Sequence, residues 1–140
     1  RPLKPESQPS MTSTIQYTLS GALTPEELAP LLESADMRSY TPEKLSQVIA
    51  GSSSYVTARD GGTLIGFGRM LSDGATLAYI NSMAVSPDYR GHGIGQAILE
   101  RLIDAAGDVS SIFLYTNTAD SLYLRNGFQA SEKRLYVRRR

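Results

Sequence analysis

Apolar and polar residues alternate along several stretches of the chain, and this alternation predicts strands. In Ile15–Ser20, for example, Ile15, Tyr17 and Leu19 alternate with polar residues, as in a strand with one buried face. Tight-turn sequences rich in Asp, Ser and Gly at residues 60–62 and 72–74 join neighbouring stretches, so those strands are expected to pair antiparallel. The expected strands are Ile15–Ser20, Ser53–Arg59, Thr63–Leu71, the run that ends at Val85, Ser111–Thr116 and Phe128–Val137.

Helices are predicted by their start signals and by apolar residues at helical spacing. Thr24 and Thr41 are each followed by a proline and a glutamate, which is the pattern of an N-cap, a first helical position and an acidic first turn. A longer helical pattern begins after Gly95, and a short one covers Ala119–Asn126, where Gly127 ends it. Two short helices are therefore expected after the first strand, and two more in the second half of the chain.

The long helix after Gly95 changes the pairing of the sheet. It leads from the strand that ends at Val85 to Ser111–Thr116, and a helical crossover of this kind joins parallel strands. The prediction is an α/β (α+β) fold with a mixed, mostly antiparallel twisted sheet of about six strands, a parallel central pair and about four flanking helices. In open sheets, ligands bind at the carboxyl ends of strands near such a change of direction.

Composition and charge restrict the classes of function. The chain has 140 residues with 14 basic and 14 acidic side chains, so one domain is expected, with no net charge to favour nucleic acid or a membrane. It has no cysteine and one histidine, so no metal site is expected. Residues 1–10 are rich in proline and are expected to be a disordered leader, native or added during cloning, ahead of a single domain over residues 11–140. Without a signal peptide or a bilayer-spanning run, the expected location is cytoplasmic.

The glycine-rich stretch Val85–Gln96 lies at a predicted junction between a strand and a helix. The first amides of a helix lack intrahelical partners and, together with the helix dipole, attract an anion such as a phosphate. Glycines at positions 91, 93 and 95 remove the Cβ atoms that would keep a ligand away from the backbone. The stretch therefore predicts an anion-binding site, although a glycine-rich turn that only connects strand to helix is the alternative.

Two other phosphate-binding loops do not match this stretch. A P-loop ends in Gly-Lys-Ser/Thr, whereas Gly95 is followed by Gln96 and Ala97. A dinucleotide-binding fingerprint requires a third glycine where Gln96 stands, and it opens a βαβ unit rather than following antiparallel strands. A nucleoside triphosphatase and a dinucleotide-binding domain are both disfavoured.

Two segments resemble a known family. Residues 90–95, Arg-Gly-His-Gly-Ile-Gly, resemble the Arg/Gln-x-x-Gly-x-Gly/Ala acetyl-coenzyme A loop of the GNAT superfamily of N-acetyltransferases. Residues 123–128, Tyr-Leu-Arg-Asn-Gly-Phe, resemble the family's Tyr-x-x-x-Gly-Phe segment, in the right order and at the usual spacing. The resemblance covers Ile15 to Val137 and implies a GNAT-like fold. It also implies transfer of the acetyl group from acetyl-coenzyme A (acetyl-CoA) to a primary amine by direct attack, through a tetrahedral intermediate and without a metal.

The resemblance also implies where the cofactor binds. The pyrophosphate would rest on the amides of the glycine loop, and the pantetheine arm would lie along the preceding strand, where a bulge turns one amide toward the thioester carbonyl as an oxyanion donor. Asn117 matches an asparagine that bonds the cofactor arm in many relatives, and a simple loop asparagine is the alternative. The implied cofactor-binding residues are Met83, Ala84, Val85, Arg90, Gly91, His92, Gly93, Ile94, Gly95, Gln96 and Asn117.

Tyr123 corresponds to the family tyrosine that protonates the departing thiolate. A phenol is protonated at neutral pH and can act as a general acid, whereas a core tyrosine on a short helix is the alternative interpretation. Many relatives place a glutamate on the fourth strand to accept the amine proton. Residues 80–83 read Ile-Asn-Ser-Met instead, so we expect a water-mediated proton path through Ser82, Asn81 or the Tyr79 hydroxyl.

The identity of the acceptor amine is left open by the sequence. A small primary amine is expected, with arylalkylamines and polyamines as candidates, because residues 66–74 resemble a run found in small GNAT enzymes that include arylalkylamine acetyltransferases. A protein or peptide amine is the second expectation, and a non-catalytic acyl-CoA-binding module is an alternative of another class. A monomer or a homodimer is expected.

Overall fold

The computed structural model describes residues 15–38 and 40–140, so the expected leader over residues 1–10 lies outside the described residues. Its sheet has five strands in the order β1-β2-β3-β4-β5. The strands are β1 (Ile15–Leu19), β2 (Ser54–Asp60), β3 (Thr63–Ser72), β4 (Leu77–Val85) and β5 (Ser111–Phe113). Neighbours from β1 to β4 pair antiparallel, whereas β4 and β5 pair parallel, as the helical crossover predicts. The predicted fold class is confirmed.

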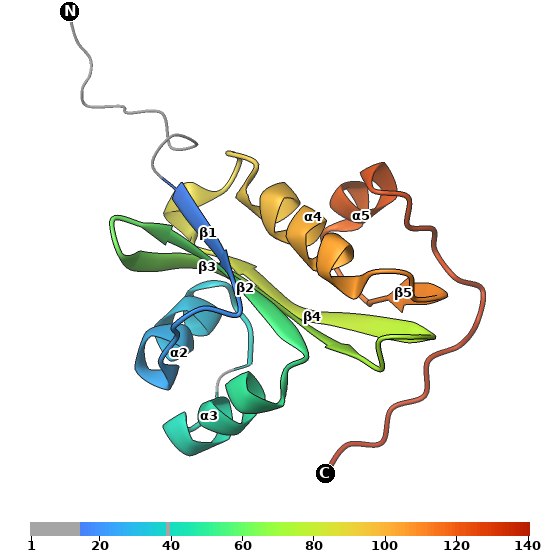
Figure 1. Ribbon diagram of the computed structural model, residues 1–140, viewed down its shortest axis with the longest axis horizontal. Coiled ribbons are helices and arrows are strands. Elements are labelled where there is room, and N and C mark those ends of the chain that lie inside the picture. Colours follow the sequence, from blue (N-terminus) through green and yellow to red (C-terminus); the bar gives the residue numbers. More distant parts are fainter. Residues whose placement is uncertain (1–14, 39) are drawn as a thin grey trace, which may run out of the picture.

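Helices cover both faces of this sheet (Figure 1). One face carries α2 (Pro25–Ser34) and α3 (Pro42–Gly51), and the other carries α4 (Ile94–Ala106) and α5 (Asp120–Arg125), while Pro87–Tyr89 forms a short 3-10 turn before α4. Each face buries its own apolar cluster, and the central strands contribute to both. Leu28, Leu31, Leu32, Leu45, Leu64, Phe67 and Ala84 form the cluster beneath α2 and α3. Val56, Met70, Ile80, Ile94, Ile98, Leu99 and Leu102 belong to the cluster beneath α4.

The start of α2 is fixed by the predicted N-cap. Thr24 Oγ1 accepts a hydrogen bond from the Glu27 amide at 3.3 Å, and Glu27 Oε2 accepts one from the Thr24 amide at 2.8 Å, which completes a capping box. Thr41 caps α3 in the same manner, accepting from the Lys44 amide at 3.2 Å. The sequence therefore placed both helix starts correctly.

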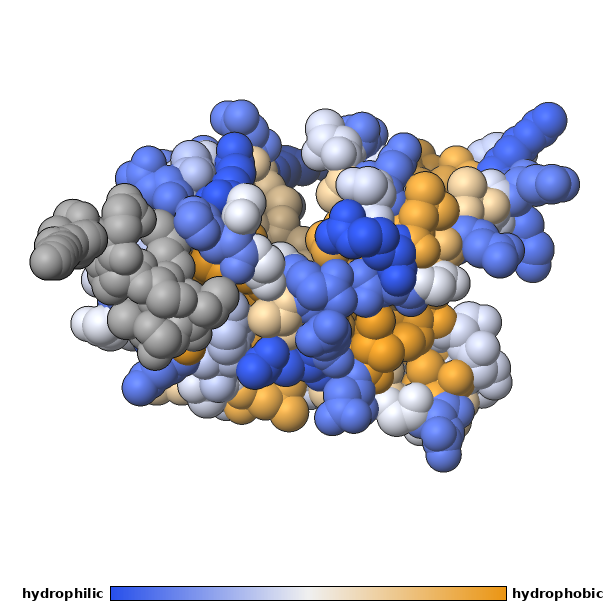
Figure 2. All heavy atoms as spheres, turned by 90° about the horizontal axis from the view of Figure 1, so that it is seen from above, coloured by the Kyte–Doolittle hydropathy of each residue, from blue (hydrophilic) through white to orange (hydrophobic). Residues whose placement is uncertain are grey.

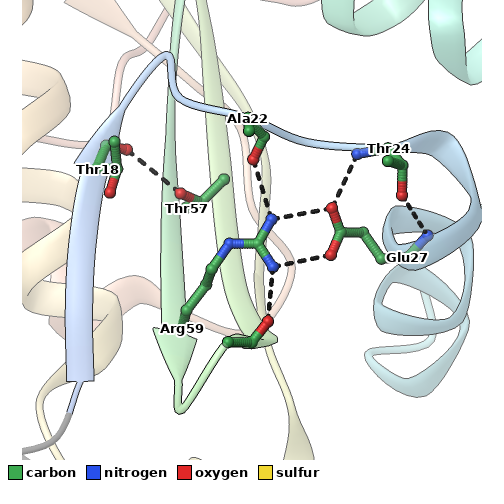
Figure 3. A network of polar contacts seen from close by, with 7 residues as sticks. Thr18, Ala22, Thr24, Glu27, Thr57 and Arg59 are labelled. Carbon is green, nitrogen blue, oxygen red and sulfur yellow. Dashed lines mark hydrogen bonds and ion pairs between the residues drawn. The ribbon is translucent and has the colours of Figure 1, made fainter.

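Glu27 also anchors α2 to the sheet (Figure 3). Its two carboxylate oxygens accept from Arg59 Nη1 and Nη2 at 2.8 and 2.9 Å, and the same guanidinium donates to the carbonyl oxygens of Gly62 and Ala22. Hydrogen bonding to Arg59, with smaller contributions from Thr24, lowers the pKa of Glu27 to about 2. The bidentate pair joins residues 32 positions apart in the chain, so local sequence patterns do not reveal it.

We expect Glu27→Gln to destabilise the protein by about 1–2 kcal/mol at pH 7, because it removes one charge from a bidentate pair that is partly exposed to solvent. Glu26→Gln, in the same helical turn but without a partner among the described residues, should change the free energy of unfolding by less than about 0.5 kcal/mol. Because the folded-state pKa of Glu27 is lowered, its contribution is present above about pH 4.5 and disappears as the pH falls toward 2. Urea denaturation of both variants across this pH range measures the difference. Equal losses in the two variants would contradict the assignment.

A glycine on β3 allows α4 to pack close to the sheet. A Cβ atom at Gly68 would stand 2.9 Å from Ile98 Cγ2 and 2.5 Å from Met83 Sδ, which is closer than real side chains approach. Because α4 sits this near, its N-terminus is held beside the end of β4. The close contact therefore helps to position the glycine loop.

The expected last strand over Phe128–Val137 does not form, so the sheet has five strands rather than about six. Leu135, Tyr136 and Val137 are 61%, 83% and 51% exposed, because they are consecutive rather than alternating and cannot share one buried face. The expected strand over Ser111–Thr116 is also shorter, ending at Phe113, after which the chain turns away toward α5. The view from above shows larger hydrophobic areas over the half of the molecule that holds α5, β5 and the C-terminal segment (Figure 2).

Candidate active site

The carboxyl half of β4 is open on one side and bulged on the other. Pairing with β5 ends at Tyr79, so the following residues of β4 have no parallel neighbour. On the β3 side, Phe67 pairs with Ala84 and Arg69 with Asn81, which leaves residues 82 and 83 opposite the single residue 68. This is a β-bulge, and Ser82 adopts a φ of 59° within it. A non-glycine residue held at positive φ is strained and re-aims the backbone, as is common at functional sites.

A cavity of about 280 Å³ opens beside this bulge. It is bounded by β4, the start of α4, the segment from β5 to α5, and one residue of the connection between α2 and α3. Its lining residues are Met37, Ile80, Asn81, Ser82, Met83, Val85, Gly95, Leu114, Tyr115, Thr116, Thr118, Ala119, Leu122 and Tyr123. The cavity thus brings together three of the predicted regions: the bulged strand, the glycine loop and the tyrosine helix.

The glycine loop ends at an uncapped helix N-terminus. Gly91 and Gly93 have φ angles of 80° and 79°, a left-handed conformation that glycine adopts without strain, and a Cβ at either position would meet open space. Gly93 is the N-cap of α4, and no side chain caps the helix there. The first-turn amides are therefore available to an anion. Arg90 and His92 are exposed beside them.

Gln96 has a role that the sequence did not reveal. Its side-chain amide exchanges two hydrogen bonds with the Asn126 amide, both at 2.8 Å, and Asn126 in turn donates to the carbonyl oxygen of Leu122 at 2.7 Å. These contacts join the first turn of α4 to the end of α5. Gly95 also faces α5, where a Cβ would make an ordinary van der Waals contact with Leu122 Cδ2 at 3.7 Å. The loop and the tyrosine helix are thus held as one unit.

Tyr123 lies on α5 with its ring in the core and lines the cavity. It is 8% exposed and packs edge-to-face on Phe128, with ring centroids 5.7 Å apart. Burial raises the pKa of its hydroxyl above the ordinary value of 10. The phenol is therefore protonated at neutral pH, which is the state that a general acid requires. The sequence offered a core tyrosine and a general acid as alternatives, but the position of Tyr123 is compatible with both, because the residue is buried and also lines the cavity.

A short polar chain reaches the cavity from β4. Ser82 Oγ donates to Asn81 Oδ1 at 2.5 Å, and Asn81 Nδ2 donates to the Tyr79 hydroxyl at 2.8 Å. Burial is the main cause of the raised pKa of Tyr79. No aspartate or glutamate is among the residues that line the cavity. Ser82, Asn81 and Tyr79 are therefore joined by hydrogen bonds beside the cavity, and their role as a proton path stays a prediction.

Asn117 is not brought into the cavity. It is exposed, although its neighbours Thr116 and Thr118 line the cavity. Thr116 instead has a structural role, because its Oγ1 accepts from the Ala119 amide at 3.1 Å just before α5 begins. Thr116, Tyr115 and Met37 also line the cavity, and none of them belongs to a motif that is recognisable in the sequence.

Other parts of the described chain offer no competing chemistry. A second opening of about 450 Å³ lies at the free edge of β5, and its lining residues include no titratable side chain. Among residues 15–38 and 40–140, no group of three or more His, Asp or Glu side chains could hold a metal ion. Within the same residues, no helix combines the length and apolarity needed to cross a membrane.

Known proteins share both the sequence pattern and the fold. The acetyltransferase (GNAT) domain family matches residues 51–130 of the chain. The N-alpha-acetyltransferase RimI of Mycobacterium tuberculosis is 38% identical over 92 residues, which cover 61% of this chain and 56% of that protein. The chain spans between 28% and 56% of the length of the curated relatives it matches.

Solved structures agree with this match over most of the chain. A Staphylococcus aureus protein described as a probable acetyltransferase superposes with a TM-score of 0.79 at 28% identity, covering 89% of this chain and 99% of that one. A GNAT-family acetyltransferase from Streptococcus pneumoniae shares the fold, with a TM-score of 0.76 at 20% identity over 90% of this chain and 99% of that one. The chain therefore belongs to the GNAT family of acetyltransferases.

Proposed function

We propose that this acetyltransferase transfers the acetyl group of acetyl-CoA to the primary amine of a small molecule. The observation that carries the proposal is the shared cavity, onto which the bulged β4, the start of α4 and the buried Tyr123 all open. Each of the three would supply a different requirement of acyl transfer: the bulge an amide for the developing negative charge, the start of α4 a place for the donor's pyrophosphate, and Tyr123 a proton for the leaving group.

The residues of the chain fit acetyl-CoA. The first-turn amides of α4, from Ile94 onward, have no side-chain cap and would hold the pyrophosphate, with Arg90 as a nearby exposed cation. The unpaired side of β4 at Met83, Ala84 and Val85 would hold the pantetheine arm through main-chain hydrogen bonds. The cofactor supplies an activated thioester, so the chain itself needs no nucleophile.

The remaining steps fall to residues of the bulge and of α5. A backbone amide of the bulge at residues 82–83 would donate to the thioester oxygen as negative charge develops there. Tyr123 would give its proton to the sulfur of the leaving group. The amine itself attacks the carbonyl carbon, and its surplus proton would pass to water molecules held by the polar groups of Ser82, Asn81 and Tyr79.

The test is release of free thiol from acetyl-CoA in the presence of a panel of small amines and short peptides with free N-termini. Amine-dependent release, with the acetylated product detected by mass spectrometry, is the expected result. Binding of acetyl-CoA without amine-dependent release across the panel would instead favour a non-catalytic acyl-CoA-binding module. Preference for peptides over small amines would support the second candidate, a protein or peptide acceptor, which the name of the 38%-identical N-alpha-acetyltransferase favours.

We expect the paired substitution Asn81→Ala and Ser82→Ala to lower kcat about tenfold at pH 7, because it interrupts the proton path without touching the loop or Tyr123. The loss should shrink as the pH rises, since more of the amine then arrives already deprotonated. Ser110→Ala, an exposed serine outside the cavity, is the matched control. An unchanged rate and an unchanged pH profile in the double variant would exclude these residues from the path.

A further inference from the structure

Arg69 carries a positive charge opposite a residue that lines the cavity, and it has no acidic partner among the described residues. It lies on β3, and its Cα partner on β4 is Asn81, which lines the cavity. Directly opposed residues of an antiparallel pair point to the same face of the sheet, so Arg69 lies on the face that α2 and α3 flank. Within the described residues, no carboxylate oxygen comes within 4.0 Å of its guanidinium.

Most of the hydrogen-bonding capacity of Arg69 is unused by the described residues. Its Nε donates to Ser52 Oγ at 3.0 Å, and the other N–H groups of the guanidinium have no protein acceptor there. Arg59 shows the contrast, because its guanidinium is occupied by Glu27 and two carbonyl oxygens. With respect to the described residues, Arg69 thus presents Nη1 and Nη2 as an unoccupied planar fork, the geometry that matches a carboxylate.

The surroundings of Arg69 make an unpaired charge costly. The side chain is half-buried, and this burial lowers the pKa of its guanidinium, while the nearby phenols of Tyr79 and Tyr40 act in the opposite direction. An arginine nevertheless stays charged at neutral pH. Tyr40 in turn lies beside a second cation, because the Arg38 guanidinium sits 5.3 Å from the centroid of its ring. An anion from outside the protein would offset the desolvation of the Arg69 charge.

An aromatic wall stands beside this fork. The Tyr79 ring stacks on Phe113 and Tyr115, with centroid distances of 5.1 and 6.0 Å. Phe113 and Tyr115 are 47% and 60% exposed, so both side chains are accessible to a ligand. Tyr115 also lines the cavity, which makes the wall continuous with the proposed site of transfer.

We propose that Arg69 binds a carboxylate on the acceptor, so that the acceptor is an amine that also carries a carboxylate, with its apolar part against Tyr79, Phe113 and Tyr115. The proposal rests on the proposed function, because it assigns this side of the cavity to the acceptor. It narrows the candidates, since the unpaired charge of Arg69 would repel a polyamine, whereas an amino acid or a short peptide carries the free carboxylate that it would bind. Arg69 is a specificity-determining residue in this scheme, while the chemistry remains with the bulge and Tyr123.

Binding of a probe pair tests the proposal without requiring turnover. Phenylacetate and phenylacetamide share the aromatic ring and differ in the charge, so ligand-observed NMR on the full chain can compare their affinities. We expect phenylacetate to bind about tenfold more tightly than phenylacetamide, and Arg69→Gln to remove this difference. Arg69→Lys should retain part of it and guards against a folding defect, and Arg101→Gln, on the exposed face of α4, is the control. Equal affinities in the wild-type protein, or an unchanged preference in a folded Arg69→Gln variant, would overturn the proposal.

A kinetic comparison separates this proposal from the proposed function. The kcat/KM for phenylalanine divided by that for phenylalaninamide should fall at least about tenfold from the wild-type protein to Arg69→Gln. The two amines have different pKa values, but this difference is the same in both proteins and cancels when the ratios are compared. Acetyl transfer with no carboxylate preference would contradict the role of Arg69 and leave the proposed function standing. If carboxylate binding depends on Arg69 but no amine makes the protein release thiol from acetyl-CoA, the role of Arg69 in carboxylate binding stands and the proposed function is contradicted.

Discussion

Tyr123→Phe is expected to lower kcat by about a hundredfold to a thousandfold while leaving the KM for acetyl-CoA within about threefold. The substitution removes only the hydroxyl, because the ring would keep its place in the core and its contact with Phe128. Burial raises the pKa of Tyr123, so the wild-type rate should show no loss of this acid through neutral pH and should fall only above about pH 10. Steady-state kinetics between pH 6 and 10.5 measure both effects.

Tyr136→Phe is the matched control, because Tyr136 is 83% exposed and is not among the residues that line the cavity. The thermal midpoint of Tyr123→Phe should stay at or above the wild-type value, since among the described residues its hydroxyl has no hydrogen-bond partner to lose. A Tyr123→Phe variant that is as active as Tyr136→Phe would remove Tyr123 from the mechanism. A lower midpoint with a proportionate loss of activity would instead indicate a purely structural role.

The features that the sequence predicted correctly are local ones. Thr24 and Thr41 start helices because each caps an amide three residues away, and the turn after Asp60 reverses the chain because two glycines adopt positive φ. The crossover to β5 follows from chain length and handedness alone. The glycine loop belongs to the same class, since the sequence of a strand, a glycine run and a helix already implies exposed amides at the helix start.

The features that the sequence missed depend on contacts between distant residues. The Arg59–Glu27 pair and the Gln96–Asn126 pair join positions about thirty residues apart, so neither leaves a periodic or adjacent signal. The failed strand near Val137 has a different cause. Its apolar residues are consecutive and are flanked by Arg134 and Arg138. A strand there would point apolar side chains to both faces, so at least one apolar face would stay exposed to solvent.

The position of the bulge could be inferred only from the family resemblance. Nothing in residues 80–83 predicts that Ser82 takes a positive φ, because serine does not favour that conformation. The structural reason lies on the neighbouring strand, where Gly68 leaves room for Met83 to fold over it. The candidate site was therefore predictable where it uses helix-terminus physics, and unpredictable where it uses strain imposed by a neighbour.

The second large effect is expected at Gly93, where aspartate and asparagine form an isosteric pair that differs by one charge. Both residues tolerate the left-handed conformation that Gly93 adopts, and a Cβ there meets no neighbouring atom. Gly93→Asp places a carboxylate beside the uncapped amides of α4, where it competes for them and repels the pyrophosphate of acetyl-CoA. We expect the Kd for CoA to rise about thirtyfold to a hundredfold in Gly93→Asp and less than about fivefold in Gly93→Asn.

Folding stability should rank the two variants the other way round from CoA affinity, with Gly93→Asp the more stable of the two. Without CoA, the negative charge at the helix N-terminus should make Gly93→Asp more stable than Gly93→Asn by about 0.3–1 kcal/mol. Calorimetric titration with CoA and denaturation of the cofactor-free protein measure the two quantities separately. A weaker affinity combined with a higher stability cannot arise from misfolding, so this combination locates the anion at the start of α4. Equal CoA affinities in the two variants would place the pyrophosphate elsewhere, even if the acetyltransferase activity itself is confirmed.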